Sequence, residues 1–139
     1  MVIVDTNVVS ELMKASRAPQ VLAWMSSQPR ENLFTTSITV AEVLFGIELL
    51  PKGKRRDTLL GKAEATFVED FAGNILTFDE PAARLFALIS ATRRSQGRPI
   101  STQDAQIAGI ARAHGAALAT RNKNDFEGCG VVIVNPWQA

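Results

Sequence analysis

The sequence predicts an α/β fold in which helices cover both faces of a mostly parallel central sheet, an α/β/α sandwich. Five short apolar segments alternate with longer stretches whose apolar residues recur at helical spacing. The last apolar segment, residues 131–134, is a continuous β-branched run, which is typical of strands buried on both faces. The sequence has no internal repeat and no linker, so we expect residues 1–139 to form a single domain.

The first half of the chain supplies two expected strands, over residues 1–4 and 32–36. Four helices are expected around them, each with apolar residues on a helical period. The first is marked by Val8, Val9, Leu12 and Met13, and the second spans residues 18–28 with Pro19 in its first turn. The third spans residues 38–50 and ends at Pro51, and the fourth spans residues 55–71 and ends at Gly73.

The second half supplies three expected strands, over residues 75–78, 116–119 and 131–134. One helix opens at Pro81 and ends near Gly97, and another runs from Ser101 to Gly115. Residues 121–130 are expected to be the longest irregular loop. Strands separated by helices in this way predict parallel pairing, because a parallel partner needs a long crossover connection.

Composition excludes several classes of protein and site. The apolar fraction of 46% and charged fraction of 21% are usual for a globular protein, and no apolar run is long enough to cross a membrane. We therefore expect a cytoplasmic protein. Cys129 is the only cysteine, which excludes an internal disulfide and a cysteine-based zinc site. His114, the only histidine, precedes Gly115 at an expected helix end, so histidine-centred catalysis is not expected.

Two basic clusters interrupt a chain whose net charge is only +1. The first contains Lys52, Lys54, Arg55 and Arg56, and the second contains Arg93, Arg94 and Arg98. Either cluster can follow a phosphate backbone, whereas a solvated helix face is the simpler interpretation of each.

Asp5 is the most informative acidic residue, because it closes the first apolar run. The carboxyl ends of parallel strands are where open α/β sheets bind ligands. An alternative is structural, since Asp5 or Thr6 can cap the helix that follows. Glu42 and Asp104 have the same two interpretations: Thr39-Val40-Ala41-Glu42 and Ser101-Thr102-Gln103-Asp104 both have the form of a capping box. Asp125 follows the fourth expected strand, where a solvated turn residue is the alternative.

These four acids, Asp5, Glu42, Asp104 and Asp125, are expected to meet at one edge of the sheet. Three follow strands, and the fourth opens a helix. Carboxylates gathered at one edge repel each other unless they are protonated or bind a cation. Hard oxygen ligands without histidine or cysteine indicate Mg²⁺ or Mn²⁺, which can polarise a phosphate and activate water.

Four motifs in this order resemble the PIN domain, and more narrowly the VapC-type toxins of bacterial toxin-antitoxin pairs. They are Met-Val-Ile-Val-Asp5-Thr6-Asn7-Val8, Ser37 to Glu42 followed by Gly46, Ser101-x-x-Asp104-x-x-Ile107-Ala108, and Ala119-Thr120-Arg121-Asn122-x-x-Asp125-Phe126. The resemblance covers essentially the whole chain. It implies an α/β/α fold and a Mg²⁺- or Mn²⁺-dependent endoribonuclease that hydrolyses RNA phosphodiester bonds.

By position in these motifs, the catalytic acids implied are Asp5, Glu42, Asp104 and Asp125, with Asp5 and Asp104 as direct metal ligands. Glu42 then completes the site or orients water. Asp125 ligates the metal directly, acts through water or shapes the loop, because Asn122 stands where many PIN domains carry an acid. The residues implied to line the pocket and position substrate are Thr6, Asn7, Ser37, Thr120 and Asn122.

The same resemblance implies partners. These are an RNA substrate, a second copy of the chain in a homodimer, and a cognate antitoxin through which the pair binds operator DNA. Candidate walls for an antitoxin groove are Val21, Leu22, Trp24 and Met25 on one helix and Leu59, Leu60 and Phe67 on another, for which core packing is the alternative.

Two other classes of function compete with this interpretation. Haloacid-dehalogenase-type phosphatases need a second aspartate two residues after the first, and here that residue is Asn7. A catalytically degenerate PIN domain that only binds RNA or a protein partner is the second alternative, against which the retention of all four acids argues.

Overall fold

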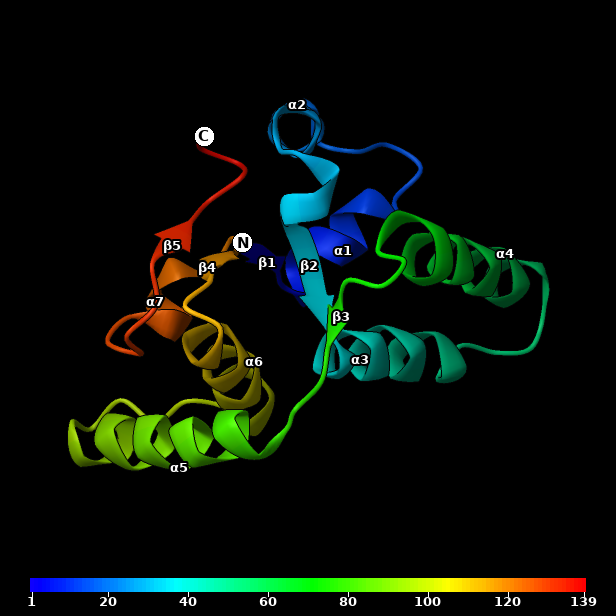
Figure 1. Ribbon diagram of the computed structural model, residues 1–139. Helices are drawn as coiled ribbons and strands as arrows, with labels where there is room; N and C mark the ends of the chain where they lie inside the picture. The colour runs from blue at the N-terminus through cyan, green and yellow to red at the C-terminus, as the bar shows by residue number, and fades with distance from the viewer.

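A wholly parallel five-stranded sheet lies at the centre of the computed structural model, which describes all 139 residues (Figure 1). Its strands are β1 (Val2–Val4), β2 (Leu33–Thr36), β3 (Ile75–Leu76), β4 (Ala117–Ala119) and β5 (Ile133–Val134), paired in the order β3-β2-β1-β4-β5. The chain therefore proceeds from β1 toward one edge and then crosses to the other side of β1. This reversal creates a switch point between β1 and β4, where α/β folds bind ligands.

Helices connect all of these strands. They are α1 (Thr6–Leu12), α2 (Pro19–Ser27), α3 (Ser37–Glu48), α4 (Lys54–Glu64), α5 (Glu80–Ser95), α6 (Thr102–Ala113) and α7 (Lys123–Phe126), with a short 3-10 turn at Arg30–Asn32. None of them is both long enough and apolar enough to span a bilayer. The α/β/α arrangement predicted from the sequence is confirmed.

Alternation along the strands divides the apolar residues between two cores. Val4 faces a cluster with α1, α2, α3 and α4, whereas Ile3 faces a cluster with α5 and α6. Register keeps each face uniform, because Ile3 pairs with Leu118 on the α6 side and Val4 pairs with Ala119 on the α1 side. Both faces of β1 are therefore buried, as its uninterrupted apolar run predicts.

α5 packs mainly against α6 rather than against the sheet, and Figure 1 shows it lying outside α6. Their close approach requires Gly109. A Cβ atom at this position would lie 2.7 Å from the carbonyl oxygen of Ala82 and 3.2 Å from the backbone nitrogen of Phe86. The small-residue face of α6 is thus used twice, with Ala105 and Ala108 buried in the interior and Gly109 admitting α5.

The expected helix over residues 55–71 is confirmed, because α4 continues into a π-helical turn, Ala65–Asp70, in which the N–H of Phe71 donates to the carbonyl of Thr66. Two other expectations about individual elements are wrong. The expected loop over residues 121–130 contains α7, which buries Phe126. The run at 131–134 belongs to an edge strand and leaves Val132 71% exposed, because a β-branched pattern does not distinguish edge from central strands.

Candidate active site

Asp5 follows β1 at the switch point of the sheet and is only 4% exposed. Its carboxylate accepts a hydrogen bond of 3.1 Å from the N–H of Val8, so Asp5, not Thr6, is the N-cap of α1. Burial raises its pKa to about 6 against the hydrogen bonds that Thr120, Val8 and Asn7 donate, and the charge of Asp104 raises it further. Asp5 therefore caps α1, and its burial disfavours the ionised form of its carboxyl group.

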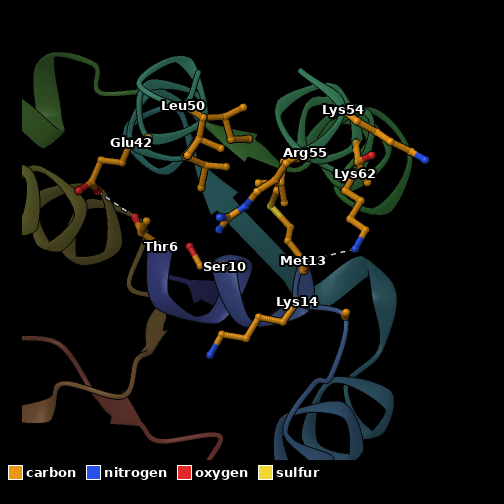
Figure 2. A pocket seen from close by; sticks show the side chains of 15 residues that line it. Thr6, Ser10, Met13, Lys14, Glu42, Leu50, Lys54, Arg55 and Lys62 are labelled. Carbon is orange, nitrogen blue, oxygen red and sulfur yellow. Dashed lines mark hydrogen bonds between the residues drawn. The ribbon is translucent and has the colours of Figure 1, made fainter. Parts of the chain in front are cut away.

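Glu42 projects from α3 toward the first turn of α1. Its Oε1 accepts a hydrogen bond of 2.8 Å from the Thr6 hydroxyl, which Figure 2 shows as a dashed line. The expected capping box at Thr39 is wrong, because Thr36 is the N-cap of α3 and its hydroxyl accepts from the N–H of Thr39. Glu42 is thus free of any capping role, and Thr6 orients it.

A network of hydroxyl groups lies behind this contact. The Thr6 and Thr39 hydroxyl oxygens are 3.2 Å apart, and the Thr36 hydroxyl donates to that of Thr39 at 3.4 Å. Thr36 and Thr39 are fully buried, so the network fixes the rotamer of Thr6 and, through it, the position of Glu42. Sequence reasoning missed Thr36 and Thr39 as part of the site, although the unusual run of hydroxyl residues around β2 was a signal for them.

Asp104 stands in the first turn of α6, which runs back across the sheet to β4 and so begins at the carboxyl edge of the strands. Ser101 caps this helix by accepting from the N–H of Asp104 at 3.2 Å. The cap thus uses the backbone of Asp104 and leaves its half-buried carboxylate facing the other acids. Burial raises the pKa of Asp104, the Ser101 hydroxyl opposes this, and the charges of Asp125 and Glu42 raise it further.

Asp125 lies on α7 and is exposed, and its position depends on a buried arginine. The guanidinium of Arg93, in a residue 4% exposed, donates to the carbonyls of Asp125 (2.9 Å), Glu127 (3.1 Å) and Arg98 (2.7 Å). A guanidinium presents several donors in one rigid plane, which suits the binding of several carbonyls at once. The solvated helix face expected for the second basic cluster is therefore wrong for Arg93, which ties α5 to the acidic segment.

The remaining expected residues lie around these acids in different environments. Thr120 is fully buried beside Asp5, and its hydroxyl accepts from the N–H of Asn122 at 3.1 Å. Asn7 and Asn122 are exposed, whereas Ser37 is half-buried at the first position of α3. Asp104 thus interacts electrostatically with Asp5, Glu42 and Asp125, so four segments distant in sequence bring their carboxylates to one region.

A family model described as the PIN domain matches residues 2–128 of this chain. The chain belongs to the PIN domain family. VapC ribonuclease Y4jK of Sinorhizobium fredii is 42% identical over 138 residues, covering 99% of each chain. Toxin FitB of Neisseria gonorrhoeae is 37% identical over 137 residues, again covering 99% of each. A solved structure of FitAB bound to the IR36 DNA fragment matches with a TM-score of 0.90 at 37% identity, covering 99% of this chain and 96% of that chain. The resemblance to VapC-type toxins is confirmed.

The donor chemistry of this PIN domain fits a hard divalent cation. Asp5 and Asp104 offer only oxygen atoms, and the charge of Asp104 raises the pKa of Asp5, an effect that a bound cation would oppose. No group of three or more His, Cys, Asp or Glu side chains stands in ligating geometry.

A large groove begins at Thr6 and Glu42 and runs between α1, α3 and α4, as Figure 2 shows. Its volume is about 990 Å³. Apolar side chains form the floor, and they include Met13, Val43, Ile47, Leu50 and Leu59. Four cationic residues also line the groove, namely Lys14, Lys54, Arg55 and Lys62. The first basic cluster is therefore split, since Lys54 and Arg55 line the groove whereas Arg56 pairs with Glu48 on α3.

The expected groove walls are divided in the same way. Val21, Trp24 and Phe67 are buried in the core, which is the alternative interpretation offered for them. Leu59 alone of the expected set lines this groove, whereas Met25 lines a separate cavity next to α2.

Proposed function

We propose that this PIN domain is a Mg²⁺- or Mn²⁺-dependent endoribonuclease that acts as the toxin of a toxin-antitoxin pair. The observation that carries the proposal is the convergence of Asp5, Glu42, Asp104 and Asp125 from four separate segments. Relatives named VapC ribonuclease and Toxin FitB, each similar over nearly the whole chain, support the same activity and role.

In this proposal Asp5 and Asp104 hold the cation. When bound, Mg²⁺ or Mn²⁺ neutralises negative charge that develops on the phosphoryl oxygens and favours deprotonation of water. Asp5 is fixed for this role by the N–H of Val8 and by the Thr120 hydroxyl, so it needs no rearrangement to bind. Preorganised groups of this kind lower the barrier because they are already oriented when charge develops.

Glu42 orients the attacking water in this proposal. One of its oxygens is occupied by the Thr6 hydroxyl, which leaves the second oxygen available to accept a proton. Asp125 completes the acidic centre from α7, where Arg93 holds its backbone. Thr6, Asn7, Ser37, Thr120 and Asn122 supply hydroxyl and amide groups that position the RNA.

The decisive experiment compares three aspartates that all stand at helix starts. Asp5→Asn and Asp104→Asn should abolish metal-dependent RNA cleavage without unfolding the protein, because asparagine is also a good N-cap at position 5 and Asp104 contributes only its backbone N–H to the cap of α6. Asp79→Asn is the matched control, since Asp79 caps α5 by accepting from Ala82 at 3.2 Å and belongs to no part of the acidic centre. It should cleave like the wild-type chain.

Unchanged cleavage by Asp5→Asn or Asp104→Asn would refute the assignment of the site. The degenerate, binding-only alternative makes a different forecast for the wild-type chain: it retains RNA in a filter assay but releases no metal-dependent product. Sequencing of the RNA ends formed after the chain is expressed alone would identify the target.

The groove between α1, α3 and α4 is the proposed seat of the antitoxin. Its apolar floor and the four cations along it suit an amphipathic segment with acidic side chains. A segment that reaches Thr6 and Glu42 would block the acidic centre from the side. We expect the double substitution Lys54→Glu and Arg55→Glu to weaken the antitoxin complex, measured by co-purification. We also expect the chain to bind operator DNA only when the antitoxin is present.

A homodimer completes the proposal, and its interface is placed on α3, where Phe45 and Leu49, one turn apart, are 66% and 69% exposed. Adjacent exposed apolar side chains of this size are typical of protein interfaces.

A further inference from the structure

A smaller pocket adjoins the large groove along α1, and the two share Ser10 and Lys14. Its volume is about 400 Å³, within the range of small-ligand sites. It is lined by Asn7, Ser10, Glu11, Lys14, Arg121, Asn122 and Trp137. We call it the Arg121 pocket. It joins three segments distant in sequence, namely α1, the turn after β4 and the carboxyl-terminal turn.

Arg121 lies against an aromatic ring in this pocket and interacts electrostatically with Glu11 without forming an ion pair. Its guanidinium carbon lies 5.1 Å from the centroid of the Trp137 ring. It forms none of the salt bridges of the protein. Trp137 is itself fixed, because its side chain packs against the core cluster that includes α1 and its backbone N–H donates to Asn135 Oδ1 at 2.9 Å. The guanidinium is therefore an exposed, supported, planar cation.

The one acid in the pocket does not oppose an anionic ligand strongly. Glu11 is buried, and its two carboxylate oxygens accept from Lys14 Nζ and from the N–H of Ala18, each at 2.9 Å. Glu11 and Lys14 thus neutralise each other. Arg121 remains as the net positive charge of the pocket.

The Arg121 pocket shares a wall with the acidic centre. The backbone of Asn7 donates to the Asp5 carboxylate. On the other side, the N–H of Asn122 donates at 3.1 Å to the Thr120 hydroxyl, which contacts the same carboxylate. The backbones of Asn7 and Asn122 are therefore linked by hydrogen bonds, directly or through Thr120, to the carboxylate that is proposed to bind metal.

We propose that the Arg121 pocket binds one nucleotide of single-stranded RNA beside the scissile phosphate, with the base on the Arg121 plane and its edge facing the amides of Asn7 and Asn122. This inference rests on the proposed ribonuclease function. Arginine planes and aromatic rings are common stacking platforms for unpaired bases, and amides both donate to and accept from base edges. This pocket adjoins the proposed antitoxin seat and shares Ser10 and Lys14 with it, whereas Arg121, Trp137 and the two asparagines line this pocket alone.

Trp137 provides a direct probe for this proposal. The chain has two tryptophans, so Trp24→Phe leaves Trp137 as the sole fluorophore. The full chain carrying Trp24→Phe and Asp104→Asn would be titrated in EDTA with a random pool of single-stranded RNA hexamers. We expect a saturable change in Trp137 fluorescence. Absence of any change on saturating RNA, with binding verified by fluorescence anisotropy of a labelled hexamer, would overturn the proposal.

Substitutions of Arg121 separate stacking from charge. Because a stacked base contributes about 1–3 kcal/mol, Arg121→Ala should weaken hexamer binding about 5- to 150-fold. Arg121→Lys keeps the charge but not the plane, so it should also bind more weakly than arginine. Arg94→Ala removes an equally exposed charge from α5 and should change affinity less than about 2-fold, since single surface charges contribute little.

Three further results would overturn the inference. They are hexamer affinity unchanged in Arg121→Ala, wild-type hexamer affinity in Arg121→Lys, or an Arg121→Ala variant that binds the antitoxin more weakly but the hexamer as well as the wild-type chain does. Failure of the ribonuclease proposal has a different signature, because binding is measured without metal. In that case the wild-type chain would yield no metal-dependent product, whatever Arg121 does to hexamer affinity.

Discussion

Replacing Asp5 by asparagine should make the protein more stable while removing its proposed activity. Asp5 is almost fully buried, and its pKa rises from the ordinary 3.8 to about 6, chiefly because burial disfavours the carboxylate. At neutral pH the folded protein therefore contains the Asp5 carboxylate as an anion, which the protein interior stabilises less well than water does. Asparagine has nearly the same shape, carries no charge and can keep the N-cap contact with Val8.

The magnitude follows from the difference in proton affinity between the folded and unfolded chains. Each tenfold change in an acid dissociation constant corresponds to about 1.4 kcal/mol, so the rise from 3.8 to about 6 costs about 3 kcal/mol above pH 6. This change of the free energy of unfolding with pH has the opposite sign to that caused by a salt-bridged acid. The folded chain binds the proton of Asp5 more tightly than the unfolded chain does, so the wild-type protein is free of this cost below pH 3.8. It loses stability as the pH rises from 3.8 to about 6.

The assay is urea denaturation at pH values from 4 to 7.5 in EDTA. We expect Asp5→Asn to raise the free energy of unfolding by up to about 3 kcal/mol at pH 7.5, with little difference near pH 4. Asp79→Asn, at an exposed cap, should match the wild-type chain at both ends of the range. Added Mg²⁺ should then stabilise the wild-type chain but not Asp5→Asn, since only a ligand that binds the folded state raises its stability.

The reasoning would be refuted if Asp5→Asn and the wild-type chain had equal stability at every pH, or if the gain were largest at pH 4. Equal stabilisation of both proteins by Mg²⁺ would refute the metal assignment alone and leave the account of burial intact.

Three further predictions concern packing and assembly. Gly109→Ala should lower the free energy of unfolding by about 1–3 kcal/mol, because the added Cβ would lie 2.7 Å from a backbone oxygen of α5. Gly61→Ala is the control, because a Cβ at this position of α4 meets no neighbouring atom, and it should raise the free energy of unfolding by about 0.5–1 kcal/mol. Thermal denaturation distinguishes the two. Arg93→Lys should lose about 1–3 kcal/mol and speed amide exchange over residues 122–130, while exposed Arg94→Lys should do neither. Phe45→Glu should convert the proposed homodimer to a monomer in sedimentation velocity, and a persistent dimer would exclude α3 as the interface.

Capping explains why the acidic residues were ambiguous in the sequence. Each stands near a helix start, and a cap is recognised by spacing alone. The structure resolves the three cases differently: Asp5 does cap its helix, Glu42 does not, and Asp104 contributes its backbone while Ser101 supplies the side chain. The two roles proved compatible for Asp5, so the presence of a cap did not argue against a site.

The amino-acid pattern by itself predicted the five strands, the helices α1 to α6 and the parallel sheet, and it led to the proposal that the acids meet at the carboxyl edge of that sheet. These follow from periodicity, from turn residues and from the rule that parallel strands share their carboxyl ends, all of which act over short stretches of chain. The apolar run before Asp5 is an example, since burial of β1 on both faces could be inferred from four residues.

Only the tertiary structure decided which groups interact across the fold. The contact of Thr6 with Glu42 spans 36 residues, and Arg93 holds a carbonyl 32 residues away. The support of Arg121 by Trp137 and the raised pKa of Asp5 likewise depend on neighbours from other segments. Solvation and hydrogen bonding are set by whatever the folded chain brings near, so local sequence, which fixes conformation within an element, carries no record of them.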